Sequence, residues 1–288
     1  MHFQEGSSCS YLHHLEEILE LAMVRIMNPL LHPDWVYRWT SMYRAEEKAL
    51  KEFHQPAKNI QLLMRKSSPT LIEDYMTSMK RIGHVDIEMF ENDLSGLIYA
   101  GHETSAITIS NTLLLLAMHP DVQDQAVAEI RQHCGTFDED ISYETLQQLV
   151  YIEMVLKESL RLFPIAPIIA RQPTHEIALG KYTVPAGVDV LLNIFNIHRN
   201  PVYWGEDAEH FRPERFATTY DRSAYLPFSA GMRNCVGAQH AMVSMKIMLI
   251  KILTSYRLKT DLKINDLSMK FVLTMKIGNG YMVRLTRS

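Results

Sequence analysis

The sequence predicts a mainly helical protein with small β-sheets, an α+β fold class, and three patterns support this prediction. Residues 11–30 place apolar side chains three and four positions apart, which is the spacing of one helix face. Residues 86–119 are apolar around the whole expected helix and end at Pro120, which predicts a central, buried helix. Short extended runs separated by turn residues follow Pro164. With 288 residues, of which 47 % are hydrophobic, the chain can bury a large core.

The expected elements on the N-terminal side begin with the helix over residues 11–30, whose apolar pattern stops before Pro29. The stretch 33–39 is rich in aromatic residues that we expect to be exposed, and a polar helix should follow it through about Lys66. Residues 67–82 carry a proline and two serines at their start and are predicted to be a linker or an irregular connection.

The C-terminal side is expected to combine helices with short strands. Helices are predicted over residues 121–133 and 238–253. Between them, one helix should begin near Ser142, and the next should end at Pro164. Four extended runs are predicted to form one small sheet, and they cover residues 165–170, 176–179, 182–184 and 188–194. Residues 256–287 alternate polar and apolar side chains around Gly278-Asn-Gly280, which predicts a terminal hairpin with its turn at these glycines.

Charge and cysteine content narrow the classes of protein. The formal net charge of −4 and the scattered basic residues give no reason to expect a nucleic-acid partner. Cys9, Cys134 and Cys235 are too few and too far apart for a disulfide framework or a zinc-site spacing, which favours a reducing compartment. No apolar run approaches the roughly 18 residues that span a bilayer. We therefore expect no membrane anchor in this chain, which is compatible with a cytosolic location.

The most informative motif is Phe-Ser-Ala-Gly-Met-Arg-Asn-Cys-Val-Gly, which runs from Phe228 to Gly237. Cys235 lies between Gly231 and Gly237, where the missing side chains let the backbone turn tightly and approach a flat, bulky group such as a haem. A thiolate there, at the start of a helix, is stabilised by the helix dipole and by free N–H groups. Arg233 could pair with a haem propionate. Taken alone, a Cys-x-Gly sequence is more often a loop that ends in a structural cysteine.

Two further motifs have ordinary explanations when each is taken alone. Gly101, Glu103 and Thr104 interrupt the long apolar helix, and the two polar residues could simply face solvent. Glu158 and Arg161 are three residues apart, hence on one helix face, where a surface pair contributes about 0.2–0.5 kcal/mol. The motifs gain meaning from their order along the chain.

In that order, the motifs resemble the cytochrome P-450 family, whose proximal haem loop has the same succession of phenylalanine, glycine, arginine, cysteine and glycine. The resemblance implies a cytochrome P-450 fold of which this chain has only the C-terminal half to two-thirds, as one partial domain over residues 1–288. Within it we expect substrate-roof helices (1–85), the oxygen-binding helix and those following it (86–164), and a β-rich region with the haem loop, proximal helix and terminal hairpin (165–288).

The resemblance also implies roles for the central helix. Gly101 corresponds to the glycine that permits a local widening of the family's oxygen-binding helix, and Thr104 with Glu103 corresponds to the pair that relays protons to dioxygen. Cleavage of the O–O bond needs two protons in a pocket that otherwise stays dry, which one hydroxyl and one carboxylate in an apolar helix can supply. The expected cofactor is haem b, with Cys235 as its axial thiolate.

A structural brace and three propionate contacts are implied in the same way. In the family, the pair that matches Glu158 and Arg161 is buried and joined by an arginine from a Pro-Glu-Arg-Phe loop, which here supplies Arg215. Arg171 and His198 match propionate-binding positions and would act together with Arg233. For a lone arginine or histidine in such places, surface solvation is the ordinary explanation. Gly231, Gly237 and Phe228 would shape the haem loop.

The match is nearest to the clan of family-four fatty-acid hydroxylases and insect enzymes. Many family-four members esterify haem to a glutamate where this chain has Ala100, so we expect non-covalent haem. The implied reaction inserts one atom of O2 into a hydrophobic small molecule. The implied electron donors are an NADPH-dependent flavoprotein reductase and, as an additional donor, cytochrome b5. Full-length microsomal relatives act at the endoplasmic reticulum membrane. Two alternatives remain: a truncated, catalytically incompetent product, and a haem-free protein in which Cys235 is a redox-active thiol.

Overall fold

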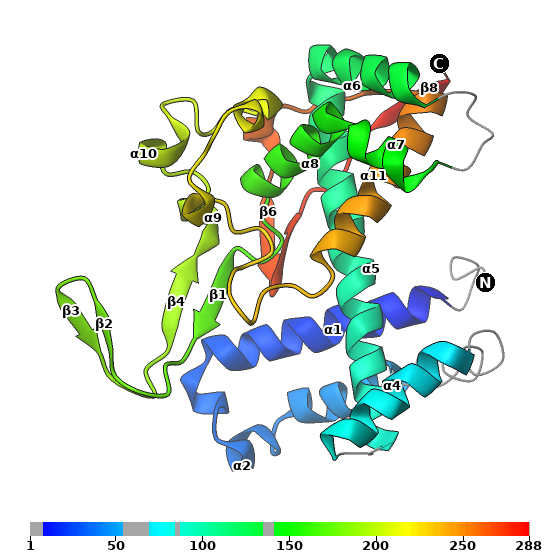
Figure 1. Cartoon of the computed structure of the whole chain (residues 1–288). Coiled ribbons are helices and arrows are strands. Elements are labelled where there is room, and N and C mark those ends of the chain that lie inside the picture. The colour runs from blue at the N-terminus through cyan, green and yellow to red at the C-terminus, as the bar shows by residue number, and fades with distance from the viewer. Residues whose placement is uncertain (1–7, 54–68, 84–86, 135–140, 288) are drawn as a thin grey trace. The chain divides into compact units, whose positions relative to one another are not determined.

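The computed structural model describes residues 8–53, 69–83, 87–134 and 141–287 (Figure 1). The chain divides into two compact units, residues 1–102 and residues 103–288. The first unit contains α1 (Ser8–Met27), the 3-10 helix η1 (Pro29–Leu31), α2 (Asp34–Tyr37), a helix over residues 41–53, α4 (Pro69–Ile82) and the first part of α5 (Ile87–Met118). That the units form one partial domain stays a prediction.

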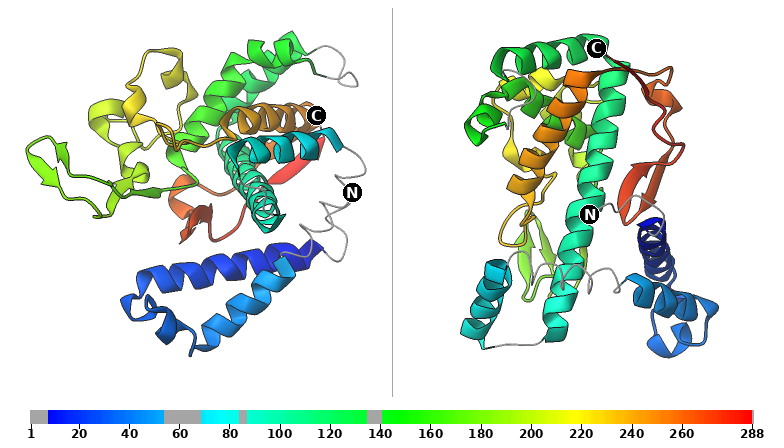
Figure 2. Two further views of the ribbon diagram at one scale, coloured as in Figure 1. Left: turned by 60° about the horizontal axis from the view of Figure 1, so that its bottom comes forward. Right: turned by 90° about the vertical axis from the view of Figure 1, so that its right-hand side faces the viewer.

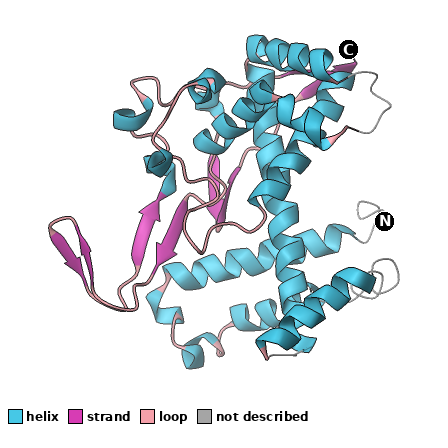
Figure 3. Ribbon diagram, in the orientation of Figure 1, coloured by secondary structure: helices cyan, strands magenta, loops and turns pink. Residues whose placement is uncertain are grey.

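The second unit holds the rest of α5 and all later elements. Its helices are α6 (Pro120–His133), α7 (Tyr143–Gln148), α8 (Val150–Leu162), α9 (Ile194–Ile197), α10 (Pro201–Trp204), η2 (Pro213–Ala217), η3 (Arg222–Ala224), α11 (Ala238–Ser255) and η4 (Ile264–Asp266). Its strands are β1 (Ile168–Arg171), β2 (Ile177–Leu179), β3 (Tyr182–Val184), β4 (Val190–Asn193), β5 (Tyr256–Lys259), β6 (Met269–Val272), β7 (Thr274–Ile277) and β8 (Arg284–Arg287). The prediction of a mainly helical fold with small sheets is confirmed (Figure 3).

In the first unit, the predicted first helix is present and ends where Asn28 begins η1, its side chain accepting a hydrogen bond from the Leu30 N–H at 3.1 Å. The linker predicted for residues 67–82 is wrong, because α4 covers most of it. Pro69 is the first residue of α4, a position at which a proline loses no helical hydrogen bond. The end of the polar helix expected through Lys66 lies outside the described residues.

The aromatic stretch 33–39 is exposed only in part. Trp35 and Trp39 are 73 % and 86 % exposed, as expected, whereas Tyr37 is buried at 1 %. The guanidinium of Arg25 lies 4.2 Å from the centre of the Tyr37 ring and covers its face. Among the described helices, none has the length and apolar character that crossing a membrane requires.

The core of the second unit forms where α5, α6, α8 and α11 meet. Figures 1 and 2 show α11 lying along the C-terminal part of α5, and apolar side chains of both helices join one cluster. Its fully buried members include Leu116, Ala126, Ile152, Leu156 and Leu249. The nearly continuous apolar pattern of the central helix is explained by this burial, because neighbours surround its C-terminal half.

The strands form four separate antiparallel pairs instead of the single small sheet predicted after Pro164. β1 pairs with β4, Ile168 lying opposite Asn193, and β2 pairs only with β3. The short β2–β3 hairpin turns at Gly180, whose φ is 60°. The tight turn lets β2 and β3 form their backbone hydrogen bonds with each other. The β2–β3 pair therefore stays separate from the β1–β4 pair.

The terminal hairpin exists, but its turn was predicted at the wrong place. β6 and β7 reverse direction at Leu273, which has a φ of 57°, and β5 pairs with β8. Gly278 follows β7, and its N–H donates to the carbonyl of Ser268 at 2.6 Å. A Cβ at Gly278 would lie 3.3 Å from the Lys270 Cβ, so the close approach of β6 favours a glycine there.

Candidate functional site: the cysteine loop and its brace

Residues 228–237, which we call the cysteine loop, connect the segment after η3 with α11. Cys235 has a free, exposed thiol, and its N–H donates to the carbonyl oxygen of Phe228 at 2.9 Å. Phe228 packs against the main core and thereby anchors the start of the loop. Gly231 has a φ of 79°, in the left-handed region that favours glycine. The loop is thus closed by two internal backbone hydrogen bonds, that of Cys235 and one from the Asn234 N–H to the Gly231 carbonyl at 3.1 Å, while the sulfur stays exposed.

The side chains of the cysteine loop fit a haem. A Cβ at Gly231 would meet no atom within 4 Å, and one at Gly237 would lie 3.9 Å from the Cys235 sulfur, so the missing side chain of Gly237 leaves space beside the thiol for another group. Arg233 is exposed and makes no hydrogen bond to the described residues. A cysteine sulfur is an established ligand of haem iron, and a guanidinium suits a carboxylate. In the described part of the chain, no three histidine, cysteine or acidic side chains gather as a metal site.

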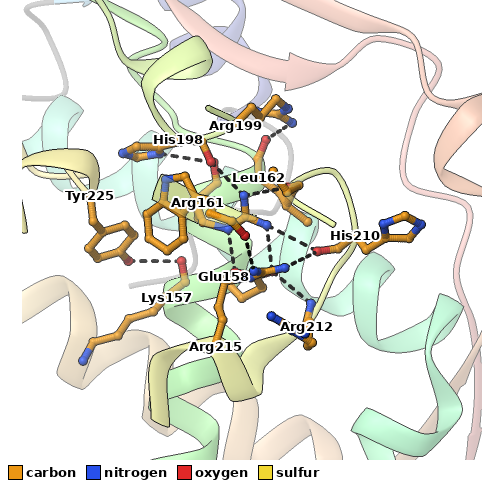
Figure 4. Close-up of polar contacts among 12 residues, drawn as sticks. Lys157, Glu158, Arg161, Leu162, His198, Arg199, His210, Arg212, Arg215 and Tyr225 are labelled. Atoms are coloured by element: carbon orange, nitrogen blue, oxygen red, sulfur yellow. Dashed lines mark hydrogen bonds and ion pairs between the residues drawn. The ribbon is translucent and has the colours of Figure 1, made fainter. Parts of the chain in front are cut away.

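A buried carboxylate lies at the centre of the neighbouring charge cluster, which we call the brace: Glu158, Arg161 and Arg215 (Figure 4). Glu158 is 0 % exposed. Its two oxygens accept from Arg161 at 2.7 and 2.8 Å, and one of them also accepts from the Arg215 Nε at 2.9 Å. The structure therefore brings together the three residues that the sequence grouped, and it buries them.

Arg161 uses all of its hydrogen-bond donors inside the protein. A guanidinium has five N–H groups. Besides its two bonds to Glu158, Nη1 donates to the carbonyls of His198 and Ala208, both at 2.7 Å, and Nη2 donates to the carbonyl of His210 at 3.3 Å. The ring of Trp204 lies 5.1 Å below the guanidinium carbon. Because every donor has an acceptor, these hydrogen bonds offset the cost of removing the charge from water.

Arg215 extends the same pattern along the irregular chain that precedes η2. It donates to the carbonyls of Trp204 at 3.1 Å and of Asp207 at 3.2 Å. The N–H of Arg212 donates to Glu158 at 2.9 Å, as Figure 4 shows. The brace thereby fixes the backbone of the segment that leads from α9 toward the cysteine loop. This segment has few regular hydrogen bonds of its own, so the side chains substitute for them.

His198 joins the brace helix to the entry of the cysteine loop. The side chain is 0 % exposed, Nδ1 lies 3.2 Å from the carbonyl of Arg161, and Nε2 accepts from the N–H of Leu226 at 2.8 Å. Burial lowers the pKa of His198 to about 4, so the ring is neutral with its proton on Nδ1. Both nitrogens are engaged with backbone groups. A propionate contact, which the sequence suggested, would require one of these bonds to break.

Arg171 reaches the cysteine loop from the end of β1. Its Nη2 donates to the hydroxyl of Ser229 at 2.9 Å, and its Nη1 donates to the carbonyl of Ala170 at 2.8 Å. The side chain is exposed. Of the two positions that matched propionate-binding residues, Arg171 is thus bonded to Ser229 within the loop, and His198 is bonded to Leu226, two residues before it.

On α5, Glu103 and Thr104 are half-buried, and Gly101 is exposed. One carboxylate oxygen of Glu103 accepts from the hydroxyl of Thr274 on β7 at 3.4 Å. The other, Oε2, is buried and has no hydrogen-bond partner among the described residues. The carbonyl of Thr104 accepts from the hydroxyl of Thr108 at 2.8 Å.

Sequence reasoning missed Ser229 and Thr274. Ser229 is 58 positions from Arg171, and Thr274 is 171 positions from Glu103. No local spacing announces contacts of this range, and only the positive φ of Ser229 marks either residue as unusual.

The chain is similar in sequence to members of one known family. The family model for cytochrome P-450 matches residues 1–283. The chain is 34 % identical over 230 residues to probable cytochrome P-450 313a4 of Drosophila melanogaster, which covers 78 % of this chain and 47 % of that protein. It is 30 % identical over 304 residues to cytochrome P-450 4p1 of the same species, covering 96 % and 58 %.

A mammalian relative gives a similar picture: cytochrome P-450 3A13 of Mus musculus is 34 % identical over 221 residues, which covers 75 % of this chain and 42 % of that protein. The chain spans about half the length of the curated relatives it matches. The match to the family model extends over nearly the whole chain, including the cysteine loop and the brace. This chain belongs to the cytochrome P-450 family.

Proposed function

We propose that the complete protein is a haem-thiolate monooxygenase. Haem ligated by a cysteine thiolate supplies the activation of O2, because electron density from the sulfur favours cleavage of the O–O bond. The observation that carries the proposal is the exposed Cys235 thiol, held in a loop that the brace supports. In this proposal Cys235 binds the iron of haem b, and Arg233 and Arg171 pair with the haem carboxylates.

The brace has a structural role in this proposal. The three brace residues hold the segment before the cysteine loop in place. His198 accepts a hydrogen bond from Leu226, two residues before the loop begins. These residues touch neither substrate nor dioxygen. They keep the sulfur at one position, which an axial ligand requires.

Glu103 and Thr104 are proposed to manage protons. They are consecutive residues of α5 and lie just before its buried part, where Ile107 and Ile109 join the core. This placement provides two proton-carrying groups beside a dry environment. Thr274 fixes one oxygen of Glu103. The buried Oε2 atom has free lone pairs that can accept a hydrogen bond from an incoming water. Gly101, two positions earlier, would permit the local widening of the helix.

The haem is proposed to be held without a covalent bond to α5. Ala100 has no carboxylate that could form an ester, whereas family-four members with covalent haem carry a glutamate there. Treatment of the haem-loaded chain with acidified organic solvent should therefore release free haem b. Retention of the porphyrin on the protein would contradict this part of the proposal.

The substrate is proposed to be an apolar small molecule, such as a fatty acid, a steroid or a xenobiotic. Electrons would come from an NADPH-dependent flavoprotein reductase, with cytochrome b5 as a second donor, at the endoplasmic reticulum membrane. The exposed Trp35 and Trp39 support contact with a membrane surface, because indole rings favour the membrane–water interface. Lipid vesicles with brominated chains should quench these two tryptophans and leave the buried Trp204 unquenched.

Turnover tests the proposed reaction. The chain, loaded with haem and supplied with reductase, NADPH and ¹⁸O2, should incorporate one ¹⁸O atom into an apolar substrate. A haem-loaded chain without any incorporation would support the alternative of a catalytically incompetent product. A chain that takes up no haem would support the alternative of a haem-free thiol protein.

A further inference from the structure

Ser229 has an unusual backbone conformation for a residue with a side chain. Its φ is 62°, and Leu273 is the other non-glycine residue with a positive φ in the described part of the chain. This region is sterically unfavourable for residues with a Cβ, and such residues persist where neighbouring contacts determine them. Ser229 lies in the cysteine loop, so the strain is located beside the proposed haem ligand.

Two hydrogen bonds fix this conformation. The N–H of Ser229 donates to the carbonyl of Leu226 at 3.1 Å, and the hydroxyl accepts from the Arg171 Nη2 at 2.9 Å. A rotation of φ into the ordinary negative range would turn the side chain away from Arg171. The strained backbone and the bond to Arg171 therefore belong together, and they tie the end of β1 to the loop.

Arg171 keeps most of its hydrogen-bonding capacity. Its bonds to Ser229 and to the carbonyl of Ala170 are its hydrogen bonds to the described residues, and a guanidinium has five N–H groups. The side chain is exposed. A guanidinium that is held at one edge and open at the others suits a carboxylate, which it can bind through two parallel hydrogen bonds.

We propose that Ser229 is a positioning residue that holds Arg171 in the orientation in which it receives a carboxylate of the cofactor. Ser229 acts through Arg171 and touches neither the iron nor dioxygen. The inference rests on the proposed haem binding. Ser229 is not among the site residues predicted from the sequence. The proposed role explains why the loop keeps a serine at a positive φ.

Haem and its dimethyl ester separate the carboxylate contribution from all other contacts, because the ester lacks both negative charges. Titration of the Soret absorption gives the dissociation constant of each porphyrin for the full chain. Ser229→Ala removes the hydroxyl and keeps a Cβ. We expect it to weaken the binding of haem about three- to tenfold, the value of one hydrogen bond, and to leave the binding of the ester unchanged.

Ser244→Ala is the matched control, because it removes a hydroxyl from α11 whose one partner among the described residues is the His240 ring at 3.4 Å. It should change neither dissociation constant. If Ser229 acts through Arg171, then Ser229→Ala should have no further effect in a chain that already carries Arg171→Gln.

Equal weakening of haem and ester by Ser229→Ala, an unchanged affinity for both, or full additivity with Arg171→Gln would overturn the inference and leave haem binding intact. Failure of the unmodified chain to develop a Soret band with either porphyrin would instead overturn the haem-binding proposal, and the inference with it.

Discussion

The brace and the cysteine loop belong to the same compact unit but differ in how their polar groups are satisfied. In the brace, Glu158 and Arg161 are 0 % exposed and Arg215 is 8 % exposed, and each donor of Arg161 has a partner within the chain. In the loop, Cys235 and Arg233 are exposed without side-chain partners among the described residues. The loop also exposes apolar side chains, since Met232 and Val236 are 101 % and 90 % exposed.

This difference separates stability from ligand binding. Groups that the chain satisfies itself contribute to the free energy of unfolding, and removal of one partner leaves a buried charge uncompensated. Groups left open cost little to remove from the apo protein, because water already solvates them. Substitutions in the brace should therefore reduce stability, and substitutions in the loop should reduce cofactor affinity.

The largest effect is expected for Glu158→Gln. The amide keeps the shape of the carboxylate but leaves the buried Arg161 without a counter-charge among the described residues, and leaves Arg215 with only Asp207, at 3.5 Å. The free energy of unfolding should therefore fall by about 3–5 kcal/mol. Urea unfolding of the apo chain measures this loss. Glu209→Gln is the control, because Glu209 pairs with Arg199 but has a side chain that is 70 % exposed, and it should cost less than about 1 kcal/mol. Similar losses for both variants would contradict the contrast.

A pH dependence is expected from His198. Its folded-state pKa of about 4 lies below the ordinary 6.5, so the unfolded chain binds a proton between these values and the folded chain does not. The stabilisation is complete above about pH 6.5 and is lost as the pH falls toward 4, by about 3 kcal/mol in total. Urea unfolding at several pH values should show this slope in the natural chain and a smaller one in His198→Gln. Identical slopes would argue against a neutral, buried ring.

A smaller loss of stability is expected when Lys246 is replaced. This lysine is buried on α11, the helix that follows the cysteine loop. Its ammonium donates to the carbonyl of Leu146 at 2.9 Å and to Glu153 at 2.8 Å. Lys246→Met should cost about 1–3 kcal/mol by leaving these acceptors short of a donor. Lys157→Met is matched to it, since Lys157 contacts the other oxygen of Glu153 at 2.7 Å from a more exposed site, and should cost less than about 1 kcal/mol. Thermal or urea unfolding distinguishes the pair, and equal costs would count against the role of burial.

The smallest effect on stability is expected for Arg233→Gln in the loop. The side chain is exposed, so the free energy of unfolding of the apo chain should change by less than about 0.5 kcal/mol. Haem affinity should nevertheless fall about tenfold, the value of one charge-assisted hydrogen bond. Arg222→Gln on η3 should alter neither quantity. A large loss of apo stability in Arg233→Gln would show that the loop is not as open as its exposure indicates.

Much of this arrangement follows from local sequence signals. The central helix was predictable because its pattern is long and apolar, and α7 because Ser142 caps its first turn by accepting from the Thr145 N–H. The grouping of Glu158 with Arg161 follows from their spacing of three on one face. Arg215 was added through its Pro-Glu-Arg-Phe loop and the family resemblance.

Other features depend on contacts that the sequence does not encode locally. Pro69 was taken for a linker signal although a proline is equally suited to begin a helix, as it does in α4. Two glycines were taken for the hairpin turn, but the chain turns at Leu273. The partners of His198 and Arg171 lie across the fold, so their bonds to Leu226 and Ser229 had no sequence signature.

The absorption spectrum of the dithionite-reduced carbon monoxide adduct tests the central claim most directly, namely that Cys235 is the haem ligand. The full chain with Cys134→Ser, which removes a buried thiol, should show the strongly red-shifted Soret band of thiolate-ligated haem. The chain with Cys235→Ser should lose that band. A red-shifted band that survives in Cys235→Ser, or that is absent from both the unmodified chain and Cys134→Ser, would contradict the account.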